Sequence, residues 1–245
     1  MTTPPPPAEP PPPPPTGAPP PPGGGSQGVP ASAADRVRFA TAQRAQTDYV
    51  FDGPGLNVFL TIITCGIFGL YLFYQLMRRD REHLRRRYEL LDAANAWAWE
   101  QANQRGLVDE LRPGFERIAQ SFGIMRAQTM EFRDPGIWLI IAIFASTIAY
   151  IVGFIFIDQD LDTHDRAEGA IEAELAQIYA RLGATLPTPD PSRVKGKHNY
   201  AARIIVTIVT CGVYHFWWLY DMQVEGNRHV EGNWPFEDAV AVAVS

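Results

Sequence analysis

The two cysteines are the residues with the most obvious capacity for chemistry in this sequence. Cys65 and Cys211 hold equivalent places in two similar phrases, TIITCGIFGLYLFY at 61–74 and TIVTCGVYHFWWLY at 207–220. A pseudo-twofold arrangement would bring the thiols together, where they could form a disulfide or share a metal ion. A metal site needs further ligands, and no histidine or carboxylate stands beside both cysteines. Inert small side chains within apolar helices are the interpretation that we favour.

An acidic stretch, DQDLDTHD at 158–165, begins like a calcium-binding loop. Such a loop requires glycine at its sixth position and glutamate at its twelfth, where Thr163 and Gly169 stand instead. We therefore interpret the acids as charge at the start of a helix, where they suit the helix dipole.

The histidines form no recognisable ligand spacing. They are scattered along the chain, at His83, His164, His198, His215 and His229. No nucleophile–base pair or phosphate-binding loop accompanies them. The sequence therefore predicts no metal, no cofactor and no catalytic residues, and the protein is expected not to be an enzyme.

Three uncharged apolar segments determine the predicted architecture and position the other residues of the chain. Residues 53–77 and 137–157 carry no charge, and neither do residues 204–220 within the third segment, 200–221. About 20 apolar residues cross a hydrocarbon core of about 30 Å. We therefore predict an all-α integral membrane protein with three hydrophobic helical segments, located in the cell (inner) membrane as a multi-pass protein. A re-entrant hairpin is the alternative for the first segment.

Each repeated phrase joins an aliphatic half to an aromatic half at T-C-G. Small residues allow close helix approach, so we predict helix packing at Thr64, Cys65, Gly66, Thr210, Cys211 and Gly212. A kink or a re-entrant turn is the alternative. Aromatic rings and arginines favour the headgroup level of a membrane. Lipid-interface positions are therefore expected at Tyr71, Tyr74, Trp217, Trp218, Tyr220, Arg78, Arg79, Arg85, Arg86 and Arg87.

The two phrases indicate an internal duplication. They align without a gap at an offset of 146 residues, which also matches His83 with His229. They resemble the signature of a bacterial integral-membrane family known only as a domain of unknown function, T-x-G-[IVL]-[YF]-x-x-Y-[WL]-x-Y. The second copy fits less well, because Trp217 replaces the first later tyrosine. The resemblance implies a membrane location and carries no activity.

Polar regions connect the apolar segments. Residues 78–134 begin with an arginine cluster, which predicts a cytoplasmic helical region interrupted at Pro113-Gly114. Residues 158–199 start acidic and are expected outside, as an amphipathic helix that ends near Gly183 and is followed by a linker. The tail at 222–245 stays unclassified.

Residues 1–52 are predicted to be a disordered tail and linker. Fifteen of the 22 prolines lie in the first thirty residues, which favours an extended polyproline II rod. The rod could be a spacer or a ligand for a proline-recognising protein. The net charge of -6 suggests no nucleic-acid partner.

These features favour a membrane scaffold or interaction protein. Its proline-rich tail and arginine-rich helix would recruit partners or anionic lipid. The lipid bilayer is the first expected partner, and a homo-oligomer formed with a second copy of the chain is a further possibility. The alternative is a small channel or transporter subunit whose path is lined by Thr61, Thr64, Thr207, Thr210 and His215.

Overall fold

A computed structural model describes residues 32–129 and 134–245 of the chain. The described residues form helices and no strands, so the prediction of an all-α fold is confirmed. The helices are α1 (Ala33–Ala42), α2 (Arg44–Thr47), α3 (Pro54–Ile63), α4 (Ile67–Gln104), α5 (Val108–Thr129), α6 (Pro135–Arg181), α7 (Tyr200–Val209) and α8 (Val213–Ala243). The proline run lies outside the described residues, so its extended conformation stays a prediction.

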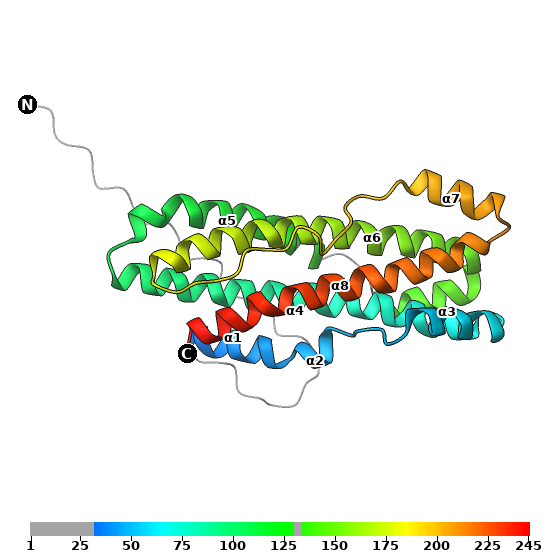
Figure 1. The fold of residues 1–245 in the computed structure, drawn as a ribbon, viewed down its shortest axis with the longest axis horizontal. Coiled ribbons are helices and arrows are strands. Elements are labelled where there is room, and N and C mark those ends of the chain that lie inside the picture. Colours follow the sequence, from blue (N-terminus) through cyan, green and yellow to red (C-terminus); the bar gives the residue numbers. More distant parts are fainter. Residues whose placement is uncertain (1–31, 130–133) are drawn as a thin grey trace, which may run out of the picture.

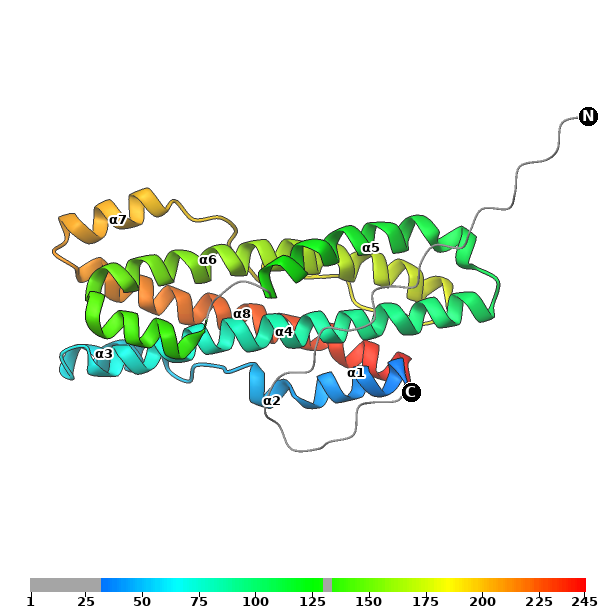
Figure 2. The ribbon, with the colours of Figure 1, turned by 180° about the vertical axis from the view of Figure 1, so that it is seen from behind.

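The helices build an elongated bundle. Long helices α4, α5, α6 and α8 run along its length, while α3 and α7 lie together at one end (Figure 1; Figure 2 shows the same from behind). The apolar faces of the helices in the polar regions meet in one core at the other end. Its members include Leu91, Phe115, Ile118, Phe122, Met125, Ile171, Leu175, Ile178, Tyr179 and Leu182.

This shared core corrects the predicted sidedness. The Tyr179 hydroxyl donates to the carbonyl of Ala94 at 3.0 Å, and Arg117 pairs with Glu174 at 2.5 Å. Residues 78–129 and 158–182 therefore pack directly against each other. They cannot lie on opposite sides of a bilayer, as the arginine and aspartate clusters had suggested.

Several helix ends differ from the expected ones. Helix α4 ends near Gly106, which has a φ of 68° and ends the helix in the left-handed region. Pro113 lies inside α5, so the predicted break there was wrong. Gly183, at a φ of 85°, follows the end of α6 as predicted. Helix α8 continues through the tail that was left unclassified.

The first helix corrects the prediction that residues 1–52 are wholly disordered. Ser32 caps α1 by accepting a hydrogen bond from the Asp35 amide at 3.1 Å. Val37 and Ala40 are buried against the core. A capped helix with a buried apolar stripe is therefore present directly after the proline-rich stretch.

The T-C-G tripeptide is a turn between two helices, not a packing surface. Cys65 and Gly66 have φ values of 50° and 91°, and Cys211 and Gly212 have 49° and 90°. Both cysteines are exposed and free. A Cβ added to either glycine would meet nothing within 4 Å. The predicted helix-packing role is therefore corrected, and a turn is observed.

Hydrogen bonds explain why the same phrase makes the same turn twice. The Gly66 amide donates to the Thr61 carbonyl at 2.8 Å, which closes a Schellman-type helix end. The Thr64 hydroxyl donates to the Leu60 carbonyl at 2.7 Å and accepts from the Phe68 amide at 3.0 Å. The second phrase repeats these three distances, at 2.8, 2.7 and 3.0 Å.

Replacing Thr64 with valine should destabilise the first helical hairpin, which is formed by α3, the first T-C-G turn and the start of α4. The change keeps the shape of the side chain but leaves the Phe68 amide without its acceptor, which is expected to cost about 1 kcal/mol, as for a lost helix cap. Denaturant titration of the full chain would measure the loss. Thr64→Ser keeps the hydroxyl and should stay close to the original stability; an equal loss in both variants would contradict the assignment.

Helix α6 also doubles back at the end where α3 and α7 lie (Figures 1 and 2). The rings of Trp138 and Phe156 are 5.5 Å apart, whereas a straight helix would separate these residues by about 27 Å. The apolar segment 137–157 is thus a third hairpin and not one straight span. Within the described residues, no helix has both the length and the apolar character needed to span a membrane.

Candidate metal centre

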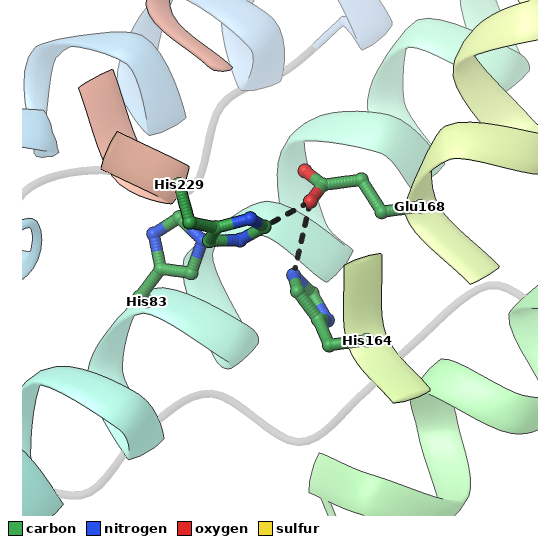
Figure 3. A group of neighbouring side chains, drawn as sticks. All are labelled: His83, His164, Glu168 and His229. Atoms are coloured by element: carbon green, nitrogen blue, oxygen red, sulfur yellow. Dashed lines mark hydrogen bonds and ion pairs between the residues drawn. The ribbon is translucent and has the colours of Figure 1, made fainter. Parts of the chain in front are cut away.

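Three helices bring four potential metal ligands together in the middle of the bundle (Figure 3). His83 comes from α4, His229 from α8, and His164 and Glu168 from one face of α6. Their ligand atoms all lie within 4.8 Å of one another. No side chain of the four is more than 4% exposed.

The ligand atoms are spaced as neighbours around one centre. The Nε2 atoms of His83 and His229 are 3.1 Å apart. Glu168 Oε2 lies 3.5 Å from His229 Nε2 and 3.4 Å from His164 Nε2. Figure 3 shows Glu168 facing both of these rings from the α6 side.

A carboxylate behind His83 fixes which of its ring nitrogens is free, and a second carboxylate lies near His229. His83 Nδ1 lies 2.9 Å from Asp48 Oδ1, and Arg86 holds the other oxygen of Asp48 at 2.5 Å. A carboxylate bound by arginine only accepts, so the proton of neutral His83 belongs on Nδ1 and Nε2 carries a lone pair. His229 Nδ1 lies 3.3 Å from Asp165 Oδ1, a contact that lacks hydrogen-bond geometry. Such carboxylate–histidine pairs orient metal ligands in known sites.

Acceptors therefore converge with few donors to satisfy them. Two donors lie nearby: the Asn233 amide nitrogen, at 3.3–3.5 Å from Glu168, His229 and His83, and Nη2 of Arg193, at 3.8 Å from Glu168 Oε2. These contacts are long, and one amide group has only two hydrogens for three acceptors. Among the described residues, neither ring nitrogen of His164 makes a hydrogen bond. Buried polar groups normally have a hydrogen-bond partner, so this ring indicates a partner that is not among the described residues.

The charge around the site also suits a cation. Five carboxylates surround it: Asp48, Asp165, Glu168, Glu172 and Glu237. Three arginines pair with them: Arg86, Arg87 and Arg193. Arg44 also reaches Glu237, but its second partner is Asp238, so this pair adds no net charge. With neutral histidines and all five carboxylates ionised, the network holds two more negative than positive charges; protonation of Glu172, whose pKa is raised to about 7, reduces this excess to one.

Burial and these pairs shift the protonation of the cluster. Burial lowers the pKa of His164 well below its ordinary value and also lowers the pKa of His229. Burial alone would raise the pKa of Glu168, but Arg87 and the neighbouring cationic groups hold it well below its usual range. Burial and the Glu168 carboxylate raise the pKa of Glu172. Neutral imidazoles beside an ionised carboxylate are the forms that bind metal ions.

A small cavity adjoins the three histidines. Its volume is about 20 Å³, and Asp158 and Glu225 line its far side. A cavity of about 10–15 Å³ or more can hold one water molecule. A four-ligand ion in the cluster could therefore also bind a single water from this side.

A second group, Asp158, His198 and Glu225, has less room for a cation. Arg203 lies 3.3 Å from Asp158 and 2.9 Å from Nδ1 of His198. His198 Nε2 lies 2.9 Å from Glu225. The Arg203 guanidinium thus already supplies the positive charge that these carboxylates need.

The structure corrects several of the predicted lipid-interface positions. Arg79, Arg86, Arg87 and Trp218 are buried, at 5% exposure or less. Arg86 and Arg87 pair with carboxylates of the central network, and the Arg79 guanidinium lies 4.8 Å from the centre of the Phe51 ring. The other predicted positions are exposed or half-buried: Tyr71, Tyr74, Trp217, Tyr220, Arg78 and Arg85.

The predicted polar lining of a channel is also placed differently. Thr61 and Thr207 are buried, and each donates its hydroxyl to its own helix, at 2.9 and 2.7 Å. Thr64 and Thr210 cap the hairpin turns. The His215 ring stacks on Phe154 with centroids 5.1 Å apart. These side chains are occupied within their own helices or in apolar packing.

Sequence reasoning dismissed the histidines, yet two signals pointed to them. His83 and His229 align with each other in the predicted duplication, so a twofold arrangement would bring them together, as it would the cysteines. His164 and Glu168 are spaced i, i+4, which places both on one face of a helix. Nothing in the sequence indicated that α6 would bring that face against both copies.

Comparison with known families recognises the carboxyl-terminal part of this arrangement. Residues 198–244 match the family described as Domain of unknown function (DUF4234). The DUF4234 segment covers α7, the second T-C-G turn and α8, and it supplies His229 and Asn233 to the site. An uncharacterised family is thus supported, as the resemblance had implied. No curated protein and no solved structure matches the chain.

Proposed function

We propose that this protein binds one divalent transition-metal ion through His83, His164, His229 and Glu168. The observation that carries the proposal is the convergence of four buried ligand atoms, with the His83 proton directed at Asp48 and both ring nitrogens of His164 without a hydrogen bond among the described residues. The ion would join α4, α6 and α8. It would thereby link the helices that follow the two copies of the duplicated turn to α6. The bound metal would thereby stabilise the middle of the bundle.

The spacing fits the coordination sphere of such an ion. Ligands at 2.0–2.1 Å around a tetrahedral centre are about 3.3 Å from one another. Three of the six ligand pairs, at 3.1, 3.4 and 3.5 Å, match this value, and all six lie within 4.8 Å. Imidazole and carboxylate ligands suit zinc, iron and related ions, while calcium and magnesium prefer oxygen alone. Zinc is the first ion to test.

Metal content can test the proposal directly. Full-length protein is stripped with a chelator and dialysed against zinc, and bound zinc is measured by atomic spectroscopy. We expect about one zinc per chain. Cobalt in the same site should give the visible bands of a four-coordinate nitrogen–oxygen site without thiolate charge transfer, since both cysteines lie in the distant turns. Failure to retain zinc, or a thiolate signature, would refute this assignment.

We further propose that the chain is a membrane protein, for which the surface supplies the support. Large apolar side chains with high exposure lie almost entirely in the three apolar segments; only Tyr49, Ile124 and Val242 lie elsewhere among the described residues. Such a concentrated apolar surface is typical of an interaction site. Recruitment of a proline-recognising partner by the tail stays part of this proposal, as does a non-enzymatic scaffold role.

The first hairpin is proposed to be a second copy of the DUF4234 unit. The repeated turn geometry supports this, together with the pairing of His83 with His229 across the bundle. In this view the metal ion sits on the pseudo-twofold axis, and α6, which has no second copy, contributes the remaining ligands. One family unit alone would hold only part of the site.

A further inference from the structure

Three helical hairpins lie at one end of the bundle and present apolar side chains outward. We propose that this end, the hairpin cap (residues 54–77, 135–157 and 200–220), inserts into one leaflet of a lipid bilayer with its turns deepest. The proposal rests on the proposed membrane location and specifies how the chain enters the lipid: each hairpin goes in and returns on the same side.

Exposure identifies lipid hydrocarbon as the occupant. The most exposed side chains include Ile67, Phe144, Ile148, Ile208, Val209 and Val213, at 67–85% exposure. They come from all three hairpins and surround the tips, rather than forming one flat face for a protein partner. One charge, Arg203, lies within the cap, where it is buried and pairs with Asp158 and Asp221. Other charges are set back toward the bundle, where Arg81 pairs with Asp134 at 2.6 Å.

The inner sides of the hairpins pack on one another, so the cap is a solid unit. Phe73 of α4 lies 4.9 Å from the Tyr150 ring of α6. Phe154 of α6 lies 5.5 Å from Trp218 of α8. A Cβ on Gly153 would come within 2.5 Å of the Phe73 ring, so α4 and α6 are in close contact here. The third hairpin therefore packs against both copies.

The depth of the cap matches half of a bilayer. Helices α3 and α7 each have ten residues, which gives about 15 Å at 1.5 Å per residue. The hydrocarbon core of a bilayer is about 30 Å thick. Tips at this depth would lie near the middle of the membrane and would not reach its far surface.

The turns meet the main requirement for backbone in lipid. Non-helical backbone is costly there unless its polar groups are hydrogen-bonded internally. In the first turn, the amides from Thr64 to Phe68 all have acceptors, at 2.8–3.2 Å. In the second turn, the amides from Thr210 to Tyr214 have acceptors at 2.8–3.1 Å. The threonine hydroxyl supplies the one acceptor that the backbone lacks.

The native cysteines allow a direct depth measurement. Cys65→Ala and Cys211→Ala each leave one exposed thiol at one tip for a nitroxide label. The labelled full-length chain is reconstituted in vesicles of phosphatidylcholine and phosphatidylglycerol. Collisions with oxygen and with a water-soluble nickel chelate then report depth. We expect both labels to be oxygen-accessible, nickel-protected and equally deep, while a label at Ser192→Cys in a cysteine-free chain stays aqueous.

Flotation separates the failure of this inference from failure of the membrane location. A chain that floats with vesicles but carries nickel-accessible tips would overturn insertion and leave the membrane location standing. Modification of the tip thiols by an impermeant reagent sealed inside the vesicles would show that the hairpins cross the bilayer. A chain that does not float would overturn both proposals.

A pair of charge substitutions gives a matched check. Phe144→Asp places a carboxylate at the 85% exposed tip of the third hairpin, and Val242→Asp does the same at a 75% exposed site on the opposite end. We expect Phe144→Asp to lower vesicle binding at least about tenfold, because charge in hydrocarbon is costly. Val242→Asp should leave binding unchanged, and equal effects of the two would contradict the inserted cap.

Discussion

Replacing His164 with leucine should abolish tight zinc binding and leave the metal-free protein as stable as before, or more so. Among the described residues the ring makes no hydrogen bond, so an apolar side chain of similar size removes an unsatisfied polar group at little cost. Zinc affinity should fall by at least about 100-fold, because even substitutions behind a ligand cost about 10–100-fold. Zinc at 100 times its Kd should stabilise the original chain by about 2.7 kcal/mol and the variant hardly at all.

His215→Leu is the matched control for this prediction. His215 is also a histidine with a ring nitrogen that makes no hydrogen bond, but it packs on Phe154 in the hairpin cap. Zinc affinity measured by competition with a chelating dye should be unchanged in this variant. Equal zinc affinity in the His164→Leu variant would remove His164 from the site. A loss of affinity in both variants would point to a general effect on folding.

The Asn233 amide offers a rival explanation of the cluster. If this amide alone satisfies the converging acceptors, Asn233→Ala should destabilise the protein strongly and zinc should have no effect. If a metal ion occupies the centre, Asn233→Ala should retain zinc, and zinc should restore much of the stability. The same unfolding titrations, with and without zinc, separate the two cases.

The apolar patterns in the sequence predicted much of the fold. The stripes through Ile118 and Ile171 are buried, and Gly183 follows the end of α6. Hydrophobic content alone did not show that the apolar segments reverse direction. The small residues of T-C-G are compatible with close helix packing and with a turn. The positive φ values at Cys65 and Gly66 in the structure identify a turn. The reversal of α6 has no glycine–proline signal within its apolar run.

The arginine cluster misled for a physical reason that the helix period could have revealed. Leu76, Arg79, His83, Arg87 and Leu90 recur every three or four residues and therefore share one face of α4. That face is apolar at both ends and buried throughout. Charges on a buried face require partners. The carboxylates that meet them lie on α6 and α8, too far along the chain for local patterns to show the pairing.

Arg87→Met should be among the most destabilising substitutions in the chain. The Arg87 side chain is fully buried and contacts three carboxylates, those of Glu168, Glu172 and Glu237. Their attraction outweighs burial and raises the pKa of Arg87 above its ordinary value. Removing the guanidinium leaves uncompensated buried charge, which is expected to cost about 3–5 kcal/mol. Denaturant unfolding of the full chain measures this loss.

Two further variants distinguish stranded charge from lost packing. Arg78→Met removes an arginine on another face of α4. Arg78 pairs with Glu82, and the two side chains are 42% and 35% exposed. It should cost no more than about 0.5 kcal/mol. Adding Glu172→Gln to Arg87→Met removes one of the carboxylates that the first change leaves unpaired, and it should recover part of the stability. If the double variant is less stable than Arg87→Met alone, packing rather than charge explains the loss, and the central network is not the electrostatic unit described above.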